Sequence, residues 1–198
     1  NEITDLVIPK LATREIQTFD ILYSQSFNDL ENLTNLTDPL LEVDNKGQIV
    51  ACLADEWGTE DNGLNWTFHI REGVNWVDKD GNVVAPVTAN DWVSSAHYAC
   101  DANNDSDTFY TMSGVIAGAD AYYDWTAYQM ALPDATDGTD EDGNAVKFIT
   151  NEDGEQEILE EVPEASIDDI GVKAVDDYTL EFTLESSRPY FLSMVSFG

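Results

Sequence analysis

A strict alternation of apolar and polar residues over positions 66–71 constrains the fold of this chain more than any other feature. Trp66, Phe68 and Ile70 alternate with polar residues. A period of two places one set of side chains on a buried face and the other set in solvent. We therefore predict a half-buried strand at residues 66–71. Residues 78–82 then favour a tight turn, because Asp, Asn and Gly suit turn conformations.

A helix start follows this turn. Pro86 cannot donate a hydrogen bond to a sheet, so strand character should end near it. The Thr88 hydroxyl can accept from the Asp91 N–H, and the Asp91 carboxylate lies at the positive end of the helix dipole. Behind this cap, apolar residues recur at helical spacing up to Cys100. The sequence therefore predicts a strand, a turn and a capped helix in succession.

The other patterned segments favour antiparallel strands with flanking helices, so the expected fold class is α+β with a mostly antiparallel sheet. Alternation at residues 179–184 matches that at residues 66–71, which predicts that both strands lie in one sheet. We predict further elements at residues 6–8 (strand), 40–50 (hairpin), 172–175 (strand), 25–35 and 118–128 (helices) and about 151–154 (hairpin turn). We expect one core that contains Trp66, Phe68, Ile70, Trp92, Leu180 and Phe182.

The charge balance restricts the partners that this chain can have. Eight basic and forty acidic side chains give a net charge of −32. Nucleic acid is excluded as a natural partner, because such binding depends on cationic neutralisation of phosphates. An anionic membrane surface would also repel the chain, and no apolar run reaches the length of a membrane span. A solvated acidic surface is the main interpretation, and attraction of cationic peptides or metal ions is the alternative.

The sequence contains no arrangement typical of catalysis. No Ser-His-Asp order, glycine-rich phosphate loop or Cys/His metal spacing stands out. Residues 101–107 space oxygen-bearing side chains as calcium loops do, but they lack the Gly and the distal Glu that such loops require, so a solvated loop is favoured. We expect no enzymatic activity and no cofactor. Cys52 and Cys100 are compatible with one disulfide or with two buried thiols.

A series of spaced motifs carries a family resemblance. In chain order these are Leu53-Ala54-Asp55-Glu56-Trp57, Trp66-Thr67-Phe68-His69-Ile70-Arg71, Trp76, Asp80-Gly81, Val87-Thr88-Ala89-Asn90-Asp91, Ile170 to Leu180, and Pro189-Tyr190-Phe191. The series resembles the signature of the peptide/nickel-type (family 5) extracellular solute-binding proteins of ABC importers. The resemblance covers most of the chain except roughly residues 117–165. A two-residue expansion between Trp76 and Gly81 is a departure in turn length alone.

The resemblance implies a function and a domain arrangement. Members of this family capture oligopeptides or dipeptides between two lobes and deliver them to a membrane permease. Residues 1–37 would lead into the first lobe, and residues 38–198 would form a small family-specific domain with an acidic insertion at about 133–163. The chain would then be a fragment of a two-lobed receptor. We expect a monomer on the extracellular or periplasmic side, anchored by an amino-terminal lipid outside this chain.

The resemblance also indicates ligand-binding positions. In relatives, the segment after a "leucine-Asp-Pro" turn runs beside the bound peptide, and here it corresponds to residues 24–27. The loop after the central helix contributes an aromatic residue, and the end of the Pro-Tyr-Phe segment borders the cleft. Packing in the core is the alternative interpretation for each Phe. The expected ligand-binding residues are Ser24, Gln25, Ser26, Phe27, Phe109, Tyr110, Ser196 and Phe197.

Three alternative functions stay open at this point. The same fold could bind a nickel chelate or an oligosaccharide. A cell-surface carbohydrate hydrolase would need two inward-facing carboxyl groups at a catalytic separation. A calcium-dependent adhesion module would need ordered oxygen cages. The sequence shows neither pattern.

Overall fold

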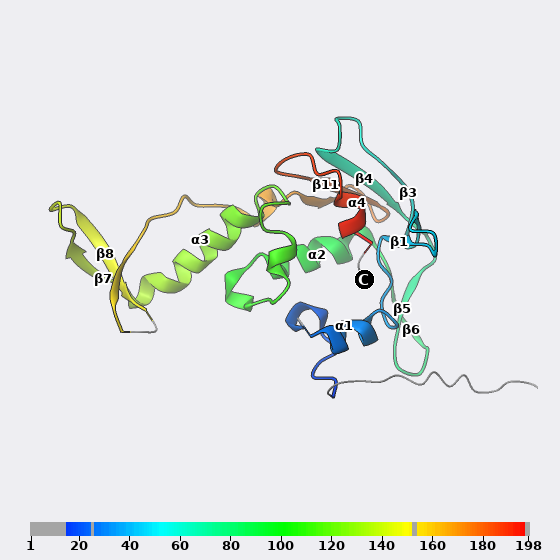
Figure 1. The fold of residues 1–198 in the computed structure, drawn as a ribbon, viewed down its shortest axis with the longest axis horizontal. Coiled ribbons are helices and arrows are strands. Elements are labelled where there is room, and N and C mark those ends of the chain that lie inside the picture. The colour runs from blue at the N-terminus through cyan, green and yellow to red at the C-terminus, as the bar shows by residue number, and fades with distance from the viewer. Residues whose placement is uncertain (1–14, 25, 152–153, 197–198) are drawn as a thin grey trace, which may run out of the picture.

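The computed structural model describes residues 15–24, 26–151 and 154–196. Figure 1 shows an elongated molecule in which helix α3 projects from a larger body and leads to a small sheet at the far end. The projection contains α3 (Ala119–Ala131), β7 (Thr136–Thr139), β8 (Ala145–Thr150) and β9 (Gln156–Leu159). The strands of the body are β1 (Leu41–Val43), β2 (Ile49–Ala51), β3 (Ala54–Gly58), β4 (Asn65–Ile70), β5 (Asn75–Val77), β6 (Val83–Pro86), β10 (Val172–Ala174) and β11 (Thr179–Thr183). Its helices are α1 (Phe27–Leu33), α2 (Ala89–Ala99) and α4 (Phe191–Met194).

The main sheet of the body has four antiparallel strands in the order β10-β11-β4-β3. Strand β4 pairs with β11, so that Phe68 lies opposite Leu180 and Trp66 opposite Phe182. The predicted pairing of these two strands is therefore confirmed, as is the hairpin formed by β1 and β2. The strand predicted at residues 6–8 lies outside the described residues.

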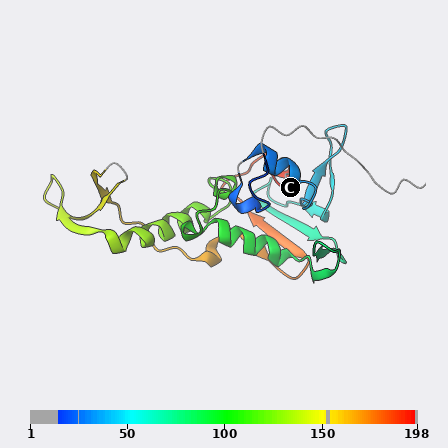
Figure 2. The same cartoon turned by 90° about the horizontal axis from the view of Figure 1, so that it is seen from below.

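One face of this sheet carries the hydrophobic core. Helix α2 packs against β10 and β11, as Figure 2 shows. Phe68 is fully buried at the centre, and its ring contacts those of Phe182 and Phe191 at centroid distances of 5.6 and 6.4 Å. Trp66 and Trp92 are only half-buried, which corrects the prediction that they lie inside the core. Phe191 comes from α4, a helix that the sequence did not predict, and its ring packs against those of Trp66, Phe68 and Phe182.

Helix α2 begins at the predicted cap. Thr88 is the N-cap in an extended conformation, and Thr88 and Asp91 form a capping box. The Thr88 N–H donates to Asp91 Oδ2 at 2.8 Å. The helix buries Ala89, Ala96 and Ala99, whose small side chains allow it to approach the sheet closely.

We expect Thr88→Ala to lower the free energy of unfolding by about 1 kcal/mol, because the replacement removes the hydroxyl of an N-cap residue. Urea denaturation of the chain measures the difference. Thr88→Ser keeps the hydroxyl and serves as the control, with a free energy of unfolding close to that of the wild type. Equal losses for the two variants would contradict a capping role for the hydroxyl.

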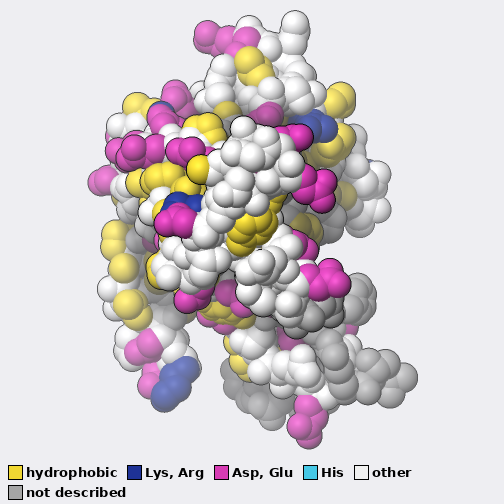
Figure 3. Space-filling model, turned by 90° about the vertical axis from the view of Figure 1, so that its left-hand side faces the viewer, with side chains coloured by type: hydrophobic (Ala, Val, Ile, Leu, Met, Phe, Trp, Pro, Cys, Tyr) yellow, Lys and Arg dark blue, Asp and Glu magenta, His cyan; other side chains and the backbone are white. Residues whose placement is uncertain are grey.

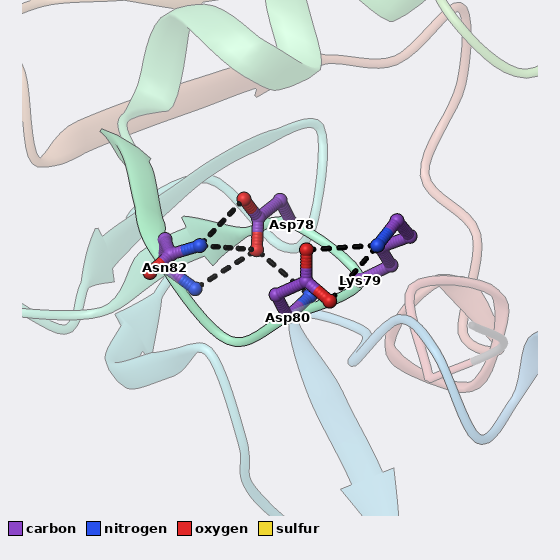
Figure 4. A network of polar contacts seen from close by, with 4 residues as sticks. All are labelled: Asp78, Lys79, Asp80 and Asn82. Atoms are coloured by element: carbon purple, nitrogen blue, oxygen red, sulfur yellow. Dashed lines mark hydrogen bonds and ion pairs between the residues drawn. The ribbon is translucent and has the colours of Figure 1, made fainter.

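Four hairpin turns among the described residues share one design, built on Asp or Asn followed three residues later by Gly. In the turn between β5 and β6, Asp78 Oδ1 accepts from the N–H groups of Asp80 and Asn82, each at 2.9 Å (Figure 4). The Asn82 side chain and these N–H groups lower the pKa of Asp78. Asp44, Asp140 and Asn151 occupy the same position in the other three turns of this design. The glycines of these turns have φ between 77° and 87°, a region that other residues seldom adopt.

These turns explain part of the acidic composition, because their carboxylates hold the protein's own backbone. Among the described residues, no group of three or more His, Cys, Asp or Glu side chains could hold a metal ion. The calcium-dependent adhesion alternative therefore gains no support from this part of the chain. Figure 3 shows the end of the molecule that carries the projection, where Asp and Glu side chains are spread over the surface and Lys and Arg are sparse.

The acidic insertion is more ordered than its composition indicated. The predicted hairpin about residues 151–154 is confirmed as the β8–β9 pair, with Phe148 opposite Ile158. Strand β7, which was not predicted, adds to the other edge of β8. The Phe148 ring lies so close to Gly138 that a Cβ at that position would be 2.5 Å from it. The absence of a side chain at Gly138 thus allows the ring to cover strand β7.

The structure also shows the state of the two cysteines and the character of the helices. Cys52 is half-buried and Cys100 is buried, and both thiols are free. Burial raises the pKa of the Cys100 thiol to about 12, so this thiol stays protonated at neutral pH. None of the helices in the described ranges is both long and apolar enough to cross a membrane.

Candidate functional site

The segment that precedes helix α1 lies against the loop that follows helix α2. The Leu22 carbonyl accepts from the Asp107 N–H at 2.8 Å and from Ser106 Oγ at 2.9 Å. Leu22 belongs to a short 3-10 helix, η1 (Ile21–Tyr23), whose start is capped by Asp20. The contact joins two segments more than eighty positions apart in the sequence (|i−j| = 84 for Ser106 and Leu22). The contact brings the predicted ligand-binding residues of the segment before α1 and those of the loop after α2 into one region of the molecule.

A tyrosine pair strengthens this junction. The Tyr23 hydroxyl donates to the Asn104 carbonyl at 2.9 Å and lies 2.5 Å from the Tyr98 hydroxyl. The Tyr98 hydroxyl therefore donates to that of Tyr23. The hydrogen bond with Tyr98 raises the pKa of Tyr23 to about 12, and desolvation and the nearby carboxylates of Asp20 and Asp105 act in the same direction. The junction should stay intact throughout the physiological pH range.

The predicted residues of the first segment are held by a buried carboxylate. Ser24 and Ser26 are buried, with 5% and 7% of their surfaces exposed, and Asp29 is fully buried. Ser24 Oγ donates to Asp29 Oδ2 at 3.2 Å, and the Gln17 N–H donates to Asp29 Oδ1 at 2.9 Å. Ser24 Oγ also accepts from the Ser26 N–H at 3.3 Å. The turn before α1 is thus tied together around the side chains of Ser24 and Asp29.

The aromatic pair predicted after α2 divides into two environments. Phe109 is half-buried and stacks on Tyr123 of α3, with ring centroids 3.9 Å apart and planes within 9° of parallel. This geometry fits the packing alternative for Phe109. The neighbouring Tyr110 is 67% exposed. Of the two side chains, that of Tyr110 is the one accessible to a ligand.

The third predicted group lies at the end of α4. Ser196 is half-buried, and its hydroxyl donates to the Leu192 carbonyl at 2.7 Å, so its hydrogen-bonding capacity is partly used within its own segment. The end of α4 is linked to β1 through the Val195 carbonyl, which accepts from the Leu41 N–H at 3.3 Å. Gln25 and Phe197 lie outside the described residues. Phe27 begins α1, but its side chain is likewise outside what the structure describes.

Sequence reasoning missed the residues that hold these segments together. Tyr23, Tyr98 and Asn104 show no periodic signal, and their meeting depends on the tertiary fold. Asp29 had a usable signal, since a carboxylate three residues after Ser26 is a helix-start signature. A hollow of about 250 Å³ also lies between residues 36–38, β5 and α2, and none of the predicted ligand-binding residues lines it.

Comparison with known proteins defines the class to which this fold belongs. Residues 48–197 match the family described as bacterial extracellular solute-binding proteins, family 5 (middle region). This match spans more than half of the chain, and the chain belongs to this family.

The relatives include oligopeptide-binding proteins of several bacteria. The chain is 30% identical over 186 residues to the oligopeptide-binding protein AmiA of Streptococcus pneumoniae, covering 94% of this chain and 22% of that protein. It is also 30% identical over 182 residues to the periplasmic oligopeptide-binding protein OppA of Escherichia coli, covering 91% of this chain and 25% of the relative.

Solved structures share the fold. An oligopeptide ABC transporter substrate-binding domain from Bacillus anthracis superposes with a TM-score of 0.67 at 24% identity, over 94% of this chain and 28% of that one. Listeria monocytogenes OppA bound to peptide gives a TM-score of 0.65 at 22% identity, over 92% and 27% of the two chains. The expected α+β fold of a two-lobed receptor is confirmed, and the chain spans between 22% and 28% of the length of these four proteins.

Proposed function

We propose that this chain is the amino-terminal part of the substrate-binding component of an ABC importer. The whole protein captures extracellular oligopeptides or dipeptides and delivers them to a membrane permease. One observation carries the proposal: four relatives named as oligopeptide-binding proteins align along 89% to 94% of this chain. The role is binding and not catalysis.

In this proposal the chain supplies part of one wall of the ligand cleft. Residues 1–37 belong to the first lobe, and residues 38–198 form a small family-specific domain with an insertion at about 133–163. A second lobe, encoded outside this chain, closes over the ligand by a hinge motion. The short share of each relative that the chain covers supports this division.

The ligand in this proposal is an extended peptide bound mainly through its main chain. Such peptides need few specific side chains, because their backbone N–H and C=O groups supply most of the hydrogen bonds. The segment at residues 24–27 runs beside the peptide, and residues 196–197 border the cleft. Of the pair at positions 109–110, Tyr110 makes the aromatic contact, because Phe109 is stacked on Tyr123.

The proposal also assigns a place in the cell. The family description as extracellular proteins supports a position outside the cytoplasmic membrane, on the extracellular or periplasmic side. There the receptor acts as a monomer, anchored by an amino-terminal lipid, and presents its closed form to the permease.

We expect the isolated chain to bind short peptides no more tightly than about millimolar, while the full-length protein binds them far more tightly. Contacts from one wall stay open to solvent, where each hydrogen bond contributes only ~1 kcal/mol. Calorimetric titration with a mixed library of dipeptides to pentapeptides measures both affinities.

Micromolar binding by the isolated chain would show that its site is complete and that the division into two lobes is wrong. The same titration should include a nickel chelate and an oligosaccharide, which are the alternative ligands for this fold. It should also include deoxycholate, because a 27% identical relative is named a probable deoxycholate-binding periplasmic protein. A full-length protein that binds one of these compounds and no peptide would overturn the assignment of peptide as the ligand.

A further inference from the structure

The small sheet at the end of the projection has an outer strand with an open edge. Strands β7, β8 and β9 pair in the order β7-β8-β9, so β9 has a strand partner on one side only. None of the three strands contributes a residue to the hydrophobic core, and each residue in them is half-buried or exposed. Figures 1 and 2 show this sheet at the far end of α3, away from the body. The edge of β9 is therefore accessible to a partner.

The register of the β8–β9 pair shows which backbone groups of β9 face outward. The Asn151 N–H donates to the Glu155 carbonyl at 2.9 Å, so these two residues form a hydrogen-bonded pair. Hydrogen-bonded and non-hydrogen-bonded pairs alternate along an antiparallel ladder. Phe148 and Ile158 lie opposite each other three positions further along, so they form a non-hydrogen-bonded pair. The N–H and C=O of Ile158 therefore point away from β8, towards the open edge.

The side chain at the centre of this edge is apolar. Ile158 is 47% exposed, and it shares one face of the sheet with Phe148, the residue opposite it. The two side chains of a non-hydrogen-bonded pair lie close together. On the other side of β8, the Phe148 ring covers Gly138. This face therefore presents apolar groups from β7 to β9, against which the apolar side chains of an added strand would pack.

Acidic side chains surround this apolar centre. Glu157 lies within β9 and Glu160 follows it, and both are exposed. The Glu157 carboxylate is held by Asn151, whose Nδ2 donates to Glu157 Oε1 at 2.6 Å. Residues 136–161 contain ten acidic side chains and one basic side chain, that of Lys147, which is paired with one of these carboxylates at 2.8 Å. The edge of β9 therefore favours a partner with positive charge.

We propose that the outer edge of β9 binds an extended cationic peptide, in which Lys or Arg alternates with apolar residues, as a fourth strand of the sheet. The main chain of the peptide bonds to the outward N–H and C=O groups of β9, such as those of Ile158. Its apolar side chains pack beside Ile158 and Phe148, and its basic side chains approach Glu157 on the opposite face. Strand β9 has four residues, so the edge suits a short peptide and not a large interface.

A second copy of this chain fits the same edge poorly. Pairing two β9 edges would bring the glutamates of one strand against those of the other, and like charges on opposing strands destabilise the pair. The same glutamates therefore oppose self-association and attract a cationic strand. The site lies in the insertion, outside the residues that the proposed function assigns to the ligand cleft, so it does not depend on that function.

Titration of the full-length protein with a defined heptapeptide tests this site. The probe has Lys at odd positions and Val at even positions, both of its ends are blocked, and the ligand cleft is first saturated with the library peptide that binds most tightly. We expect a dissociation constant below about one millimolar at low salt, which rises with salt because exposed charges are screened. Hydrogen exchange followed by mass spectrometry should be slower at residues 156–160 when the probe is bound.

Altered probes separate strand addition from simple attraction of charge. Methylation of the probe's backbone nitrogens that face β9 removes hydrogen-bond donors but keeps the charge, and it should weaken binding at least about tenfold. A probe with Glu in place of Lys should not bind.

Two double variants of the protein test the role of the glutamates. Glu157→Gln with Glu160→Gln should raise the dissociation constant of the probe about three- to tenfold, because each opposite-charge pair across strands contributes modestly. The matched control is Glu141→Gln with Asp142→Asn in the β7–β8 turn, which should leave the dissociation constant within about twofold. All four side chains are exposed, so neither double variant should prevent folding.

Equal binding of the methylated and unmethylated probes, or equal losses for the two double variants, would show that charge alone attracts the probe and would overturn the proposal. No binding at about one millimolar probe would also overturn it. Slow exchange at β9 that arises from self-association of the protein without probe would assign the edge to a second copy instead. If the library peptides do not bind, the proposed function is wrong, and the titration of the β9 edge is read in the same way.

Discussion

Replacing Phe68 with Ala should lower the free energy of unfolding of this chain by about 3–5 kcal/mol. Phe68 is fully buried on β4, and its ring contacts those of Trp66, Phe182 and Phe191. The truncation leaves a cavity that strands on both sides cannot fill, because neighbouring side chains are held by the sheet register. Urea denaturation followed by tryptophan fluorescence measures the loss.

Phe19→Ala is the matched control for this truncation. Phe19 is 59% exposed, so the same chemical change should alter the free energy of unfolding by no more than about 0.5 kcal/mol. The comparison isolates burial from the intrinsic effect of removing an aromatic ring. Similar losses for both variants would mean that Phe68 is not at the centre of the core.

Replacing Gly118 with Ala should cost about 2–5 kcal/mol, the sum of backbone strain and overpacking. Gly118 is the N-cap of α3 with φ of 74°, a left-handed conformation that Ala adopts only with strain. A Cβ at this position would lie 2.5 Å from the Asp169 carbonyl oxygen. Asp169 lies two residues before Gly171, whose N–H donates to the Ala117 carbonyl at 2.8 Å. The clash should therefore loosen the attachment of α3 to the body.

Gly114→Ala separates the two contributions. Gly114 also has a positive φ, 65°, but a Cβ there would meet nothing within 4 Å. Its replacement should cost only the strain of the left-handed conformation, about 1–2 kcal/mol. Chemical denaturation of both variants gives the difference. If Gly118→Ala costs no more than Gly114→Ala, the close approach of Asp169 is not a constraint on the fold.

Much of the fold followed from local patterns. Alternation at residues 66–71 predicted β4, the Thr88 and Asp91 pair predicted the start of α2, and the Asp78 turn was expected from its residues. The order of the spaced motifs predicted the family, which the family match over residues 48–197 confirms. The assignment of the ligand-binding residues from that resemblance stays a prediction.

Local sequence patterns predicted less of the candidate site than of the fold. The contact between Leu22 and Ser106 was not predicted, because the resemblance indicated only the neighbouring residues 24–27 and 109–110, as two separate segments. The stack of Phe109 on Tyr123 could not be foreseen, because the relevant partner lies on a helix with aromatic residues on several faces. Sequence alone therefore could not decide that Tyr110 is exposed and Phe109 is packed.

The sequence by itself determined the features that depend on near neighbours. Strand alternation, helix caps and Asp-Gly turns act within a few residues, so their physical causes are visible in the order of side chains. The tertiary structure alone decided that Phe191 completes the core and that Asp29 holds the chain before α1 instead of capping it. In both cases a side chain had several possible partners, and close packing between two segments selected one of them. Local sequence patterns do not predict that those segments meet. The same signature at residues 26–29 and 88–91 could therefore form two different sets of hydrogen bonds.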